Sequence, residues 1–307
     1  MKKQFAQIAA LWKEDKRRYV KESSYATYIQ LLNGLILPFF ADREPAANCV
    51  QEFADSLLEK GLAPKTVKDT VLVLKMVLRF GAALGAWPHI DCKVRYPSVY
   101  EKRPEVAALR VKEQLRLQSY LRENLNFKNL GILICLYSGL RIGEVCALQW
   151  KDIDIAAGVI HVSKTVQRVY LHDGDQYVYA LRMGSPKTVS SERDIPILKE
   201  FATLIRPVKR MMKPDCFVVS GTSTPLEPRY LRDYYHRLLE RLKIRRLRFH
   251  ALRHSFATRC IESGCDYKTV SAILGHSSIS TTLDLYVHPD TAQKRRCLER
   301  MSRHIRA

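Results

Sequence analysis

NLGILICLYSGLRIGEVCA, residues 129–147, carries the strongest fold signal in the chain. Residues 129–140 are apolar on every side at helical spacing, which predicts a helix buried at the centre of a domain. Arg141 and Glu144 follow in the frame Ser-Gly-Leu-Arg-x-x-Glu. Taken alone, Arg141 is an ordinary helix-end partner of Glu144. Beside further polar groups, its planar guanidinium becomes a candidate for holding a phosphate.

Five more candidate site residues stand in recognisable frames further along the chain. Lys187 lies in Pro-Lys-Thr, on a loop expected to follow a strand. His250 and Arg253 form His-Ala-Leu-Arg, and their i, i+3 spacing puts them on one helix face. His276 follows a glycine expected to end a helix, and Tyr286 ends Thr-Thr-Leu-Asp-Leu-Tyr. Each of them has an ordinary structural interpretation, so the functional interpretation rests on the ordered set.

This set of side chains can break and rejoin a phosphodiester without metal or ATP. Two guanidinium groups match the non-bridging oxygens and can take the place of a metal ion. A tyrosine phenol has a pKa of about 10, so a nearby histidine has to accept its proton. A lysine can protonate the departing oxygen, and each such transfer typically contributes about 10²–10⁴-fold. Attack by a side chain conserves the bond energy in a covalent ester.

The composition bounds the class of protein. A chain of 307 residues fits two domains. Its 51 Lys and Arg against 31 Asp and Glu give a net charge of +20. This excess favours a polyanionic partner, most often nucleic acid, although a basic surface that only aids solubility stays open. The eight cysteines lack CxxC pairs and zinc-site spacing, so we expect reduced, mostly buried thiols in a cytosolic protein and no metal. We also expect no membrane span and no signal peptide.

Hydrophobic periodicity predicts helices over the first third of the chain. The predicted features are an apolar face at Phe5, Ile8, Ala9 and Trp12; a helix from Tyr25 to Leu35, capped by Ser23-Ser24 and stopped before Pro38; a helix from Val50 to Lys60 ending at Gly61; and a long helix from Pro64 to near Gly85. Residues 88–104 hold three prolines and four basic residues, and we interpret them as an interdomain linker. The linker charges are either solvated or form a strap against DNA.

After the linker, the chain reads as helices with a small β region. The predicted helices cover residues 111–125 and 129–140. The predicted strands cover residues 159–162, 166–171, 176–181 and 195–198, with a turn at 172–175, and helices follow from residue 199. The fold class is therefore mainly α with a small antiparallel β-sheet (α+β).

These motifs, in this order, resemble the tyrosine recombinases: phage and mobile-element integrases, Xer recombinases and Cre-like enzymes. The resemblance covers nearly the whole chain. It implies a helical, SAM-like core-binding domain at residues 1–87 and a catalytic domain at 105–307, which form a C-shaped clamp on DNA. An additional N-terminal arm-binding domain is not expected.

The resemblance also assigns roles at the phosphate. Arg141 and Arg253 would bind the scissile phosphate, His276 would hydrogen-bond it, and Glu144 would support the site structurally.

For the proton transfers, the resemblance implies Lys187 as the general acid for the 5′ oxygen and His250 as the group assisting at the tyrosine. Tyr286 would be the nucleophile that forms a 3′-phosphotyrosyl bond. No cofactor and no metal are implied.

The implied reaction is site-specific recombination through a Holliday junction, by a homotetramer on two double-stranded DNA core sites. Residues 289–307 would dock into a neighbouring protomer, or form only a frayed basic terminus. Accessory DNA-bending or directionality factors are further candidate partners, and a cytoplasmic, nucleoid-associated location in a prokaryote, phage or mobile element is expected. Two rival readings are a type IB topoisomerase, which uses similar chemistry without synapsis, and a DNA-binding accessory protein without catalysis.

Overall fold

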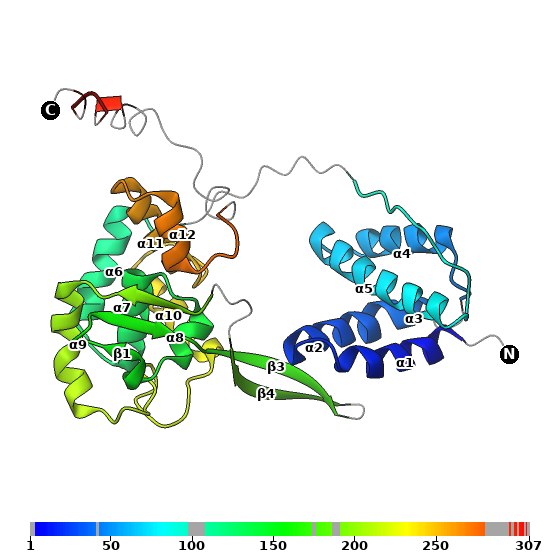
Figure 1. Ribbon diagram of the computed structural model, residues 1–307, viewed down its shortest axis with the longest axis horizontal. Helices are drawn as coiled ribbons and strands as arrows, with labels where there is room; N and C mark the ends of the chain where they lie inside the picture. Colours follow the sequence, from blue (N-terminus) through cyan, green and yellow to red (C-terminus); the bar gives the residue numbers. More distant parts are fainter. Residues whose placement is uncertain are drawn as a thin grey trace. The chain divides into compact units, whose positions relative to one another are not determined.

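The computed structural model describes residues 4–40, 43–97, 108–173, 176–185 and 191–279, with short helical pieces between residues 295 and 305 (Figure 1). The chain divides into two compact units. The first unit comprises residues 1–102 with residues 169–180, and the second unit comprises residues 103–168 and 181–307. The described part is mainly helical with small sheets, one of them antiparallel throughout, which confirms the predicted fold class.

The first unit is a bundle of helices around one apolar core. Its helical elements are α1 (Phe5–Arg17), α2 (Glu22–Leu31), the π-helical turn η1 (Leu32–Ile36), α3 (Leu37–Phe40), α4 (Ala47–Glu59) and α5 (Pro64–Ala83). The apolar face predicted for the first helix is buried, and Pro64 opens α5 at its first position as predicted. Gly61 and Gly85 follow α4 and α5 with φ of 78° and 70°, in the left-handed region that favours glycine.

The predicted helix stop before Pro38 is wrong. The segments α2, η1 and α3 follow one another without interruption to Phe40, so Pro38 lies within helical structure. A proline lacks a backbone donor and crowds the carbonyl four residues earlier, which here belongs to Gly34. The π-helical turn over residues 32–36 contains that glycine and widens the backbone where the misfit falls. The N-cap is Lys21 and not the predicted serine pair.

Residues 87–97 belong to the first unit and pack against its helices α4 and α5. The Trp87 side chain is buried, and its Nε1 donates to the Leu78 carbonyl at 2.8 Å. Gln51 exchanges two hydrogen bonds with the backbone of Arg95, at 2.8 and 3.1 Å. A Cβ on Gly81 would lie 2.0 Å from Trp87 Cζ2, so only glycine lets the indole approach this closely. The first part of the expected linker is thus fixed to α4 and α5, and residues 98–107 lie outside the described residues.

The second unit surrounds the helix predicted from residues 129–140. Its helical elements are α6 (Val111–Glu123), α7 (Phe127–Ser138), α8 (Ile142–Ala147), the 3₁₀ turn η2 (Trp150–Asp152), α9 (Lys199–Met211), α10 (Pro228–Arg241), α11 (Ala251–Glu262) and α12 (Tyr267–Leu274). Buried residues cover every side of α7, which confirms its predicted place at the centre. Asn126 caps its first turn by accepting from the Asn129 N–H at 2.9 Å.

The strands form two small sheets. One is antiparallel in the order β1 (Ile153–Asp154), β2 (Val159–Val162) and β5 (Arg193–Pro196), and the other pairs β3 (Thr165–Asp173) with β4 (Gln176–Gly184). The prediction missed β1 and placed β5 two residues too late. Residues 174–175 of the predicted turn lie outside the described residues.

Gly139 ends α7 and brings two later helices close to it. Its φ of 68° is left-handed, and an added Cβ would lie 2.7 Å from Leu274 Cδ2 and from Phe256 Cδ1. Because α11 and α12 approach this turn without a side chain between them, the segment that carries Arg141 lies directly beside the end of α12.

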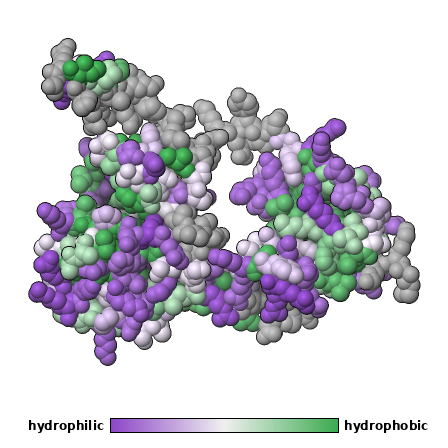
Figure 2. Space-filling view, in the orientation of Figure 1, coloured by the Kyte–Doolittle hydropathy of each residue, from purple (hydrophilic) through white to green (hydrophobic). Residues whose placement is uncertain are grey.

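Both units present many hydrophilic side chains on the face seen in Figure 2. Among the described residues, no helix is both long and apolar enough to span a bilayer.

The prediction of mostly buried cysteines is wrong for those described: Cys135 and Cys146 are buried, Cys265 is exposed, and the other four are half-buried. The two buried thiols lie on the central helices α7 and α8, whereas Cys265 follows the end of α11.

Candidate active site

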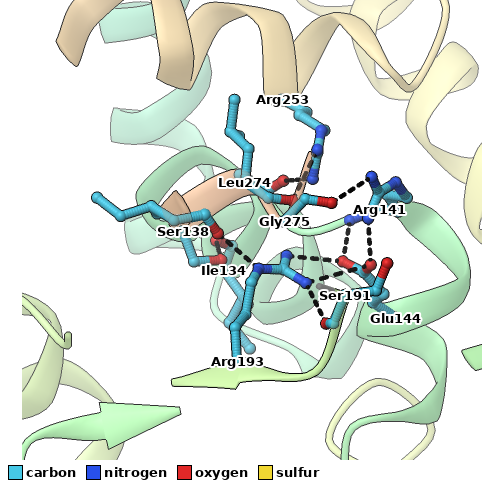
Figure 3. Close-up of polar contacts among 11 residues, drawn as sticks. Ile134, Ser138, Arg141, Glu144, Ser191, Arg193, Arg253, Leu274 and Gly275 are labelled. Carbon is cyan, nitrogen blue, oxygen red and sulfur yellow. Dashed lines mark hydrogen bonds and ion pairs between the residues drawn. The ribbon is translucent and has the colours of Figure 1, made fainter. Parts of the chain in front are cut away.

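The site is built around the C-terminal end of α12, where three consecutive carbonyls each accept a hydrogen bond from a different arginine (Figure 3). Arg193 Nε donates to Ile273 O at 2.5 Å. Arg253 Nη2 donates to Leu274 O at 2.8 Å, and Arg141 Nη2 donates to Gly275 O at 3.2 Å. The last carbonyls of a helix lack partners within the helix and lie at the negative end of its dipole. The end of α12 therefore gathers three cations from separate parts of the chain.

Gly275 shapes this helix end and places His276 beside it. Gly275 has a φ of 65°, and its N–H donates to Ala272 O at 3.0 Å. The N–H of His276 donates back to Ser271 O at 3.1 Å, which is the pattern of a glycine-terminated helix. The predicted position of His276 in the turn after α12 is confirmed.

Glu144 holds two of the three arginines. Its side chain is 3% exposed, and its Oε1 accepts from Arg141 Nη1 at 2.7 Å. Its Oε2 accepts from the Arg141 N–H at 2.9 Å and from Arg193 Nη2 at 3.0 Å. Burial alone would raise the pKa of Glu144, but the hydrogen bonds and charges of Arg193 and Arg141 outweigh it and hold that pKa below its ordinary value. The carboxylate is thus ionised at neutral pH.

Arg141 and Arg253 lie on either side of this helix end, on two rigid elements. Arg141 is the N-cap of α8, and Arg253 lies in the first turn of α11 with 2% of its surface exposed. Arg253 Nη1 also donates to Gly139 O at 2.9 Å, which ties α11 to the turn after α7. The two candidate phosphate ligands, 112 residues apart in sequence, are thus brought together through α12.

Three histidines accompany the arginines, and all three have lowered pKa values. His250 is the N-cap of α11, and its ring lies edge-on to that of His254, with 4.5 Å between centroids. Partial burial, followed by His254 and Arg253, lowers the pKa of His250 to about 4. Burial and Arg253 lower the pKa of His254 to about 4, and burial with Arg253 and Arg141 does the same for His276. Near neutral pH these imidazoles are uncharged and able to accept a proton.

The charges around the end of α12 favour an anion. The three arginines contribute +3, Glu144 contributes −1 and the histidines are neutral, so these groups sum to +2 at neutral pH. A phosphodiester carries one negative charge, and more charge gathers on its non-bridging oxygens during transfer. Within the described residues, no cluster of three or more His, Cys, Asp or Glu side chains could hold a metal ion.

A basic pocket of about 610 Å³ adjoins His250. Arg232 and His236 of α10 line one part of it, and Arg246 and Arg248 of the segment before α11 line another. The pocket can accept a further part of an extended polyanion next to the histidine.

Two of the candidate residues, Lys187 and Tyr286, lie outside the described residues. The strand β4 does end at Gly184, shortly before Lys187. No role was predicted for Arg193 or His254 from the sequence. The repeat of histidine one turn after His250 was a usable signal for His254, whereas a lone arginine at the start of a strand gave none.

Comparisons with known proteins identify the family of the chain. The phage integrase family matches residues 108–293, more than half of the chain. The chain is 25% identical over 275 residues to a XerC-like tyrosine recombinase of Caldanaerobacter subterraneus subsp. tengcongensis, covering 82% of this chain and 70% of the relative. It is 28% identical over 260 residues to the ICEBs1 integrase of Bacillus subtilis, covering 78% and 66%.

Solved structures of integrases have a similar fold. The Tn1549 transposon integrase in complex with transposon right end DNA matches with a TM-score of 0.71 at 25% identity, covering 98% of this chain and all of that one. A lambda integrase tetramer bound to a Holliday junction matches with a TM-score of 0.63 at 15% identity, covering 93% and 78%, which is a likeness of fold alone. The chain belongs to the phage integrase family, the tyrosine-type site-specific DNA recombinases.

Proposed function

We propose that this recombinase cleaves and rejoins DNA at the end of α12, with Tyr286 as the nucleophile and a Holliday junction as the intermediate of exchange. The observation that carries the proposal is the convergence of Arg141, Arg253 and His276 on one helix end. These groups come from three elements, and nothing in ordinary folding requires a cluster of cations with an excess of two charges. A phosphodiester supplies the missing negative charge.

The two arginines bind the scissile phosphate in this proposal. Arg253 is almost fully buried and fixed by two backbone carbonyls, so its remaining surface presents a rigid charge. Arg141 is 37% exposed at its side chain and can turn donors toward the ligand. Because guanidinium stays charged at any working pH, the pair stabilises the transition state without a metal ion. His276 donates a hydrogen bond to a non-bridging oxygen.

In the proposed cleavage, one bond to phosphorus forms, one breaks and two protons move. The Tyr286 oxygen bonds to phosphorus, the bond from phosphorus to the 5′ oxygen breaks, and the phosphate stays attached to the DNA 3′ end. His250 takes the phenol proton, and Lys187 gives a proton to the 5′ oxygen. A negative phosphate beside His250 raises the pKa of that histidine from about 4 toward the working pH, which makes it a better base. The 5′ hydroxyl of another strand then reverses the reaction.

The substrate in this proposal is double-stranded DNA held by both units. The net charge of +20 and the basic pocket beside His250 support an extended contact with phosphates. We place core binding in residues 1–87 and catalysis in residues 105–307, and both contact the duplex. This substrate also places the protein in the cytoplasm, next to the nucleoid.

The active assembly we propose is a homotetramer on two DNA sites, with residues 289–307 docked on a neighbouring protomer. Leu298, Met301 and Ile305 are 62%, 54% and 74% exposed in the single chain, and the described pieces of this segment carry hydrophobic side chains at the surface in Figure 2. Three exposed apolar side chains at helical spacing are typical of a segment that packs on a partner.

A plasmid assay tests the proposal. Duplexes from a library that become covalently attached to the protein identify the core site, and two copies are then placed on one supercoiled plasmid. We expect deletion or inversion between the copies, and neither product with Tyr286→Phe. Relaxation of plasmids without exchange, whether or not they carry the sites, would point to a topoisomerase. DNA binding without any covalent attachment would indicate an accessory protein and would overturn the proposal.

A further inference from the structure

We propose that Arg193 is a positioning residue of this active site: its forked guanidinium holds Glu144 and the end of α12 in the one arrangement in which Arg141 can bind the scissile phosphate. The inference rests on the proposed function and adds to it a residue that itself does not touch the substrate.

The donors of Arg193 are directed into the protein (Figure 3). Its side chain is 7% exposed. Nε donates to Ile273 O at 2.5 Å, and Nη1 donates to Ser191 O at 2.9 Å. Nη2 donates to Glu144 Oε2 at 3.0 Å, and Nη1 lies 3.4 Å from Oε1. A side chain this buried and this fully bonded to the protein serves to orient its partners.

Arg193 reaches Arg141 through one shared carboxylate. Glu144 gives one oxygen to Arg141 Nη1, and its other oxygen lies between the Arg141 N–H and Arg193 Nη2. The carboxylate is therefore held from both sides, and its plane sets the direction of the Arg141 guanidinium. Without Arg193, the carboxylate keeps only one cationic partner and is free to rotate with it.

Arg193 also connects this network to the sheet. It begins β5, which pairs with β2 over four residues from Val159↔Pro196 to Val162↔Arg193. Its Nε bonds the carbonyl of Ile273, next to the carbonyls that Arg253 and Arg141 use. Of the three arginines at this helix end, Arg193 is the one that comes from a strand. Arg193 thus fixes the position of the end of α12 relative to the sheet. Both candidate phosphate ligands and His276 are positioned with that helix end.

For this positioning role, the forked shape of the Arg193 guanidinium matters more than its positive charge. A lysine at this position keeps a positive charge, but one ammonium cannot contact Ile273 O and both Glu144 oxygens in the geometry that the guanidinium spans. Arg193→Lys therefore isolates the positioning role. Arg245 offers a matched control elsewhere in the same unit, because its guanidinium bridges the carboxylate of Glu113, on α6, and the Ala108 carbonyl with the same kind of fork.

The experiment compares the parent, Arg193→Lys, Arg245→Lys and Arg141→Ala on a nicked core-site duplex. The scissile phosphate is native, a neutral methylphosphonate or a 5′-bridging phosphorothiolate. DNA affinity, the rate of covalent attachment and the melting temperature are recorded. Should Arg193→Lys fold poorly, Arg193→Gln takes its place, and rates are measured well below the lowest melting temperature.

We expect Arg193→Lys to bind DNA like Arg245→Lys and to attach to native DNA roughly 10–100-fold more slowly than the parent. On the methylphosphonate, the difference in attachment rate between Arg193→Lys and the parent should be smaller, as for Arg141→Ala, because a neutral phosphorus centre needs less charge stabilisation from the guanidinium pair. The phosphorothiolate, whose sulfur leaves without needing a proton, should leave this difference in attachment rate unchanged.

Three results would overturn the inference. Arg193→Lys could attach to native DNA as fast as Arg245→Lys, or it could be slowed as much on the methylphosphonate as on native DNA. The third is a rate difference between Arg193→Lys and the parent that disappears only on the phosphorothiolate. The last would assign Arg193 to the segment of the general acid, Lys187, six residues earlier. A parent that forms no adduct would refute the proposed function itself, whereas an active parent with an equally active Arg193→Lys would refute only this inference.

Discussion

Replacing Glu144 by glutamine is the sharpest test of how the site is held together. The carboxylate is almost fully buried and bonds to two arginines and one backbone N–H. Glutamine keeps the shape, removes the negative charge and turns one acceptor into an NH₂ donor. At least one arginine N–H then faces another donor, and two guanidinium charges lose their counterion.

The magnitude follows from the exposure of the two partners. Removing one member of a buried ion pair costs about 3–5 kcal/mol, because the remaining charge stays buried without compensation. The Arg193 side chain is 7% exposed and falls in this class. The Arg141 side chain is 37% exposed, so water replaces much of its lost interaction and it adds at most about 1 kcal/mol. We therefore expect a loss of at least about 3 kcal/mol in the free energy of unfolding of the second unit.

Scanning calorimetry measures this loss, with Glu113→Gln as the control. Glu113 occupies the same position in α6, accepting from the Arg110 N–H at 2.7 Å and pairing with Arg245, whose side chain is 43% exposed. A loss of about 3 kcal/mol lowers the melting temperature of a unit of this size by about 6–12 °C. The control should lose no more than about 1 kcal/mol. Equal shifts for the two variants would refute the account of Glu144 as the buried counterion of the site.

The remaining predictions concern two close approaches and the site histidines. Gly139→Ala and Gly158→Ala both put an alanine in the left-handed region, which costs about 1–2 kcal/mol, but only at Gly139 would the new Cβ meet a neighbour, at 2.7 Å. In urea unfolding, Gly139→Ala should therefore lose about 1–3 kcal/mol more stability than Gly158→Ala. Equal losses for the two variants would contradict this. Gly81→Ala should lower the stability of the first unit and displace Trp87, whose fluorescence reports it; an unchanged spectrum and midpoint would refute the packing. Histidines of the unfolded chain take up a proton at a pH of about 6.5, but those of the folded site do so only at about 4, so the urea midpoint should fall as the pH is lowered through this range. A midpoint that rises on acidification would contradict the lowered pKa values.

Much of the fold was predictable because it is encoded by residues close together in sequence. Gly61, Gly85 and Gly275 each follow a run of helical periodicity, and each adopts the left-handed backbone that ends a helix. The central helix α7 was recognisable from its apolar composition alone. The stop predicted at Pro38 failed because a π-helical turn, which has no clear local signature, absorbs the proline. The strand β1 was missed because two residues carry no periodicity.

The site was predictable to the extent that its motifs are local. Arg141 was predicted either as the partner of Glu144 or as a phosphate ligand. The structure confirms the pair with Glu144, and the role as a phosphate ligand stays a prediction. Arg193 could not have been found in this way. Its main partners lie 49 and 80 residues away, and only the folded chain brings them together.

In the proposed reaction, Tyr286 attacks the scissile phosphate without a metal. The most direct measurement incubates the protein and Tyr286→Phe with a nicked core-site duplex in the presence of EDTA, and sequences the peptide attached to the DNA 3′ end. We expect an SDS-resistant adduct at Tyr286 in the parent, none in the variant, and unchanged DNA binding in both. An adduct at another residue, an adduct that persists in Tyr286→Phe, or one that EDTA abolishes would contradict the account.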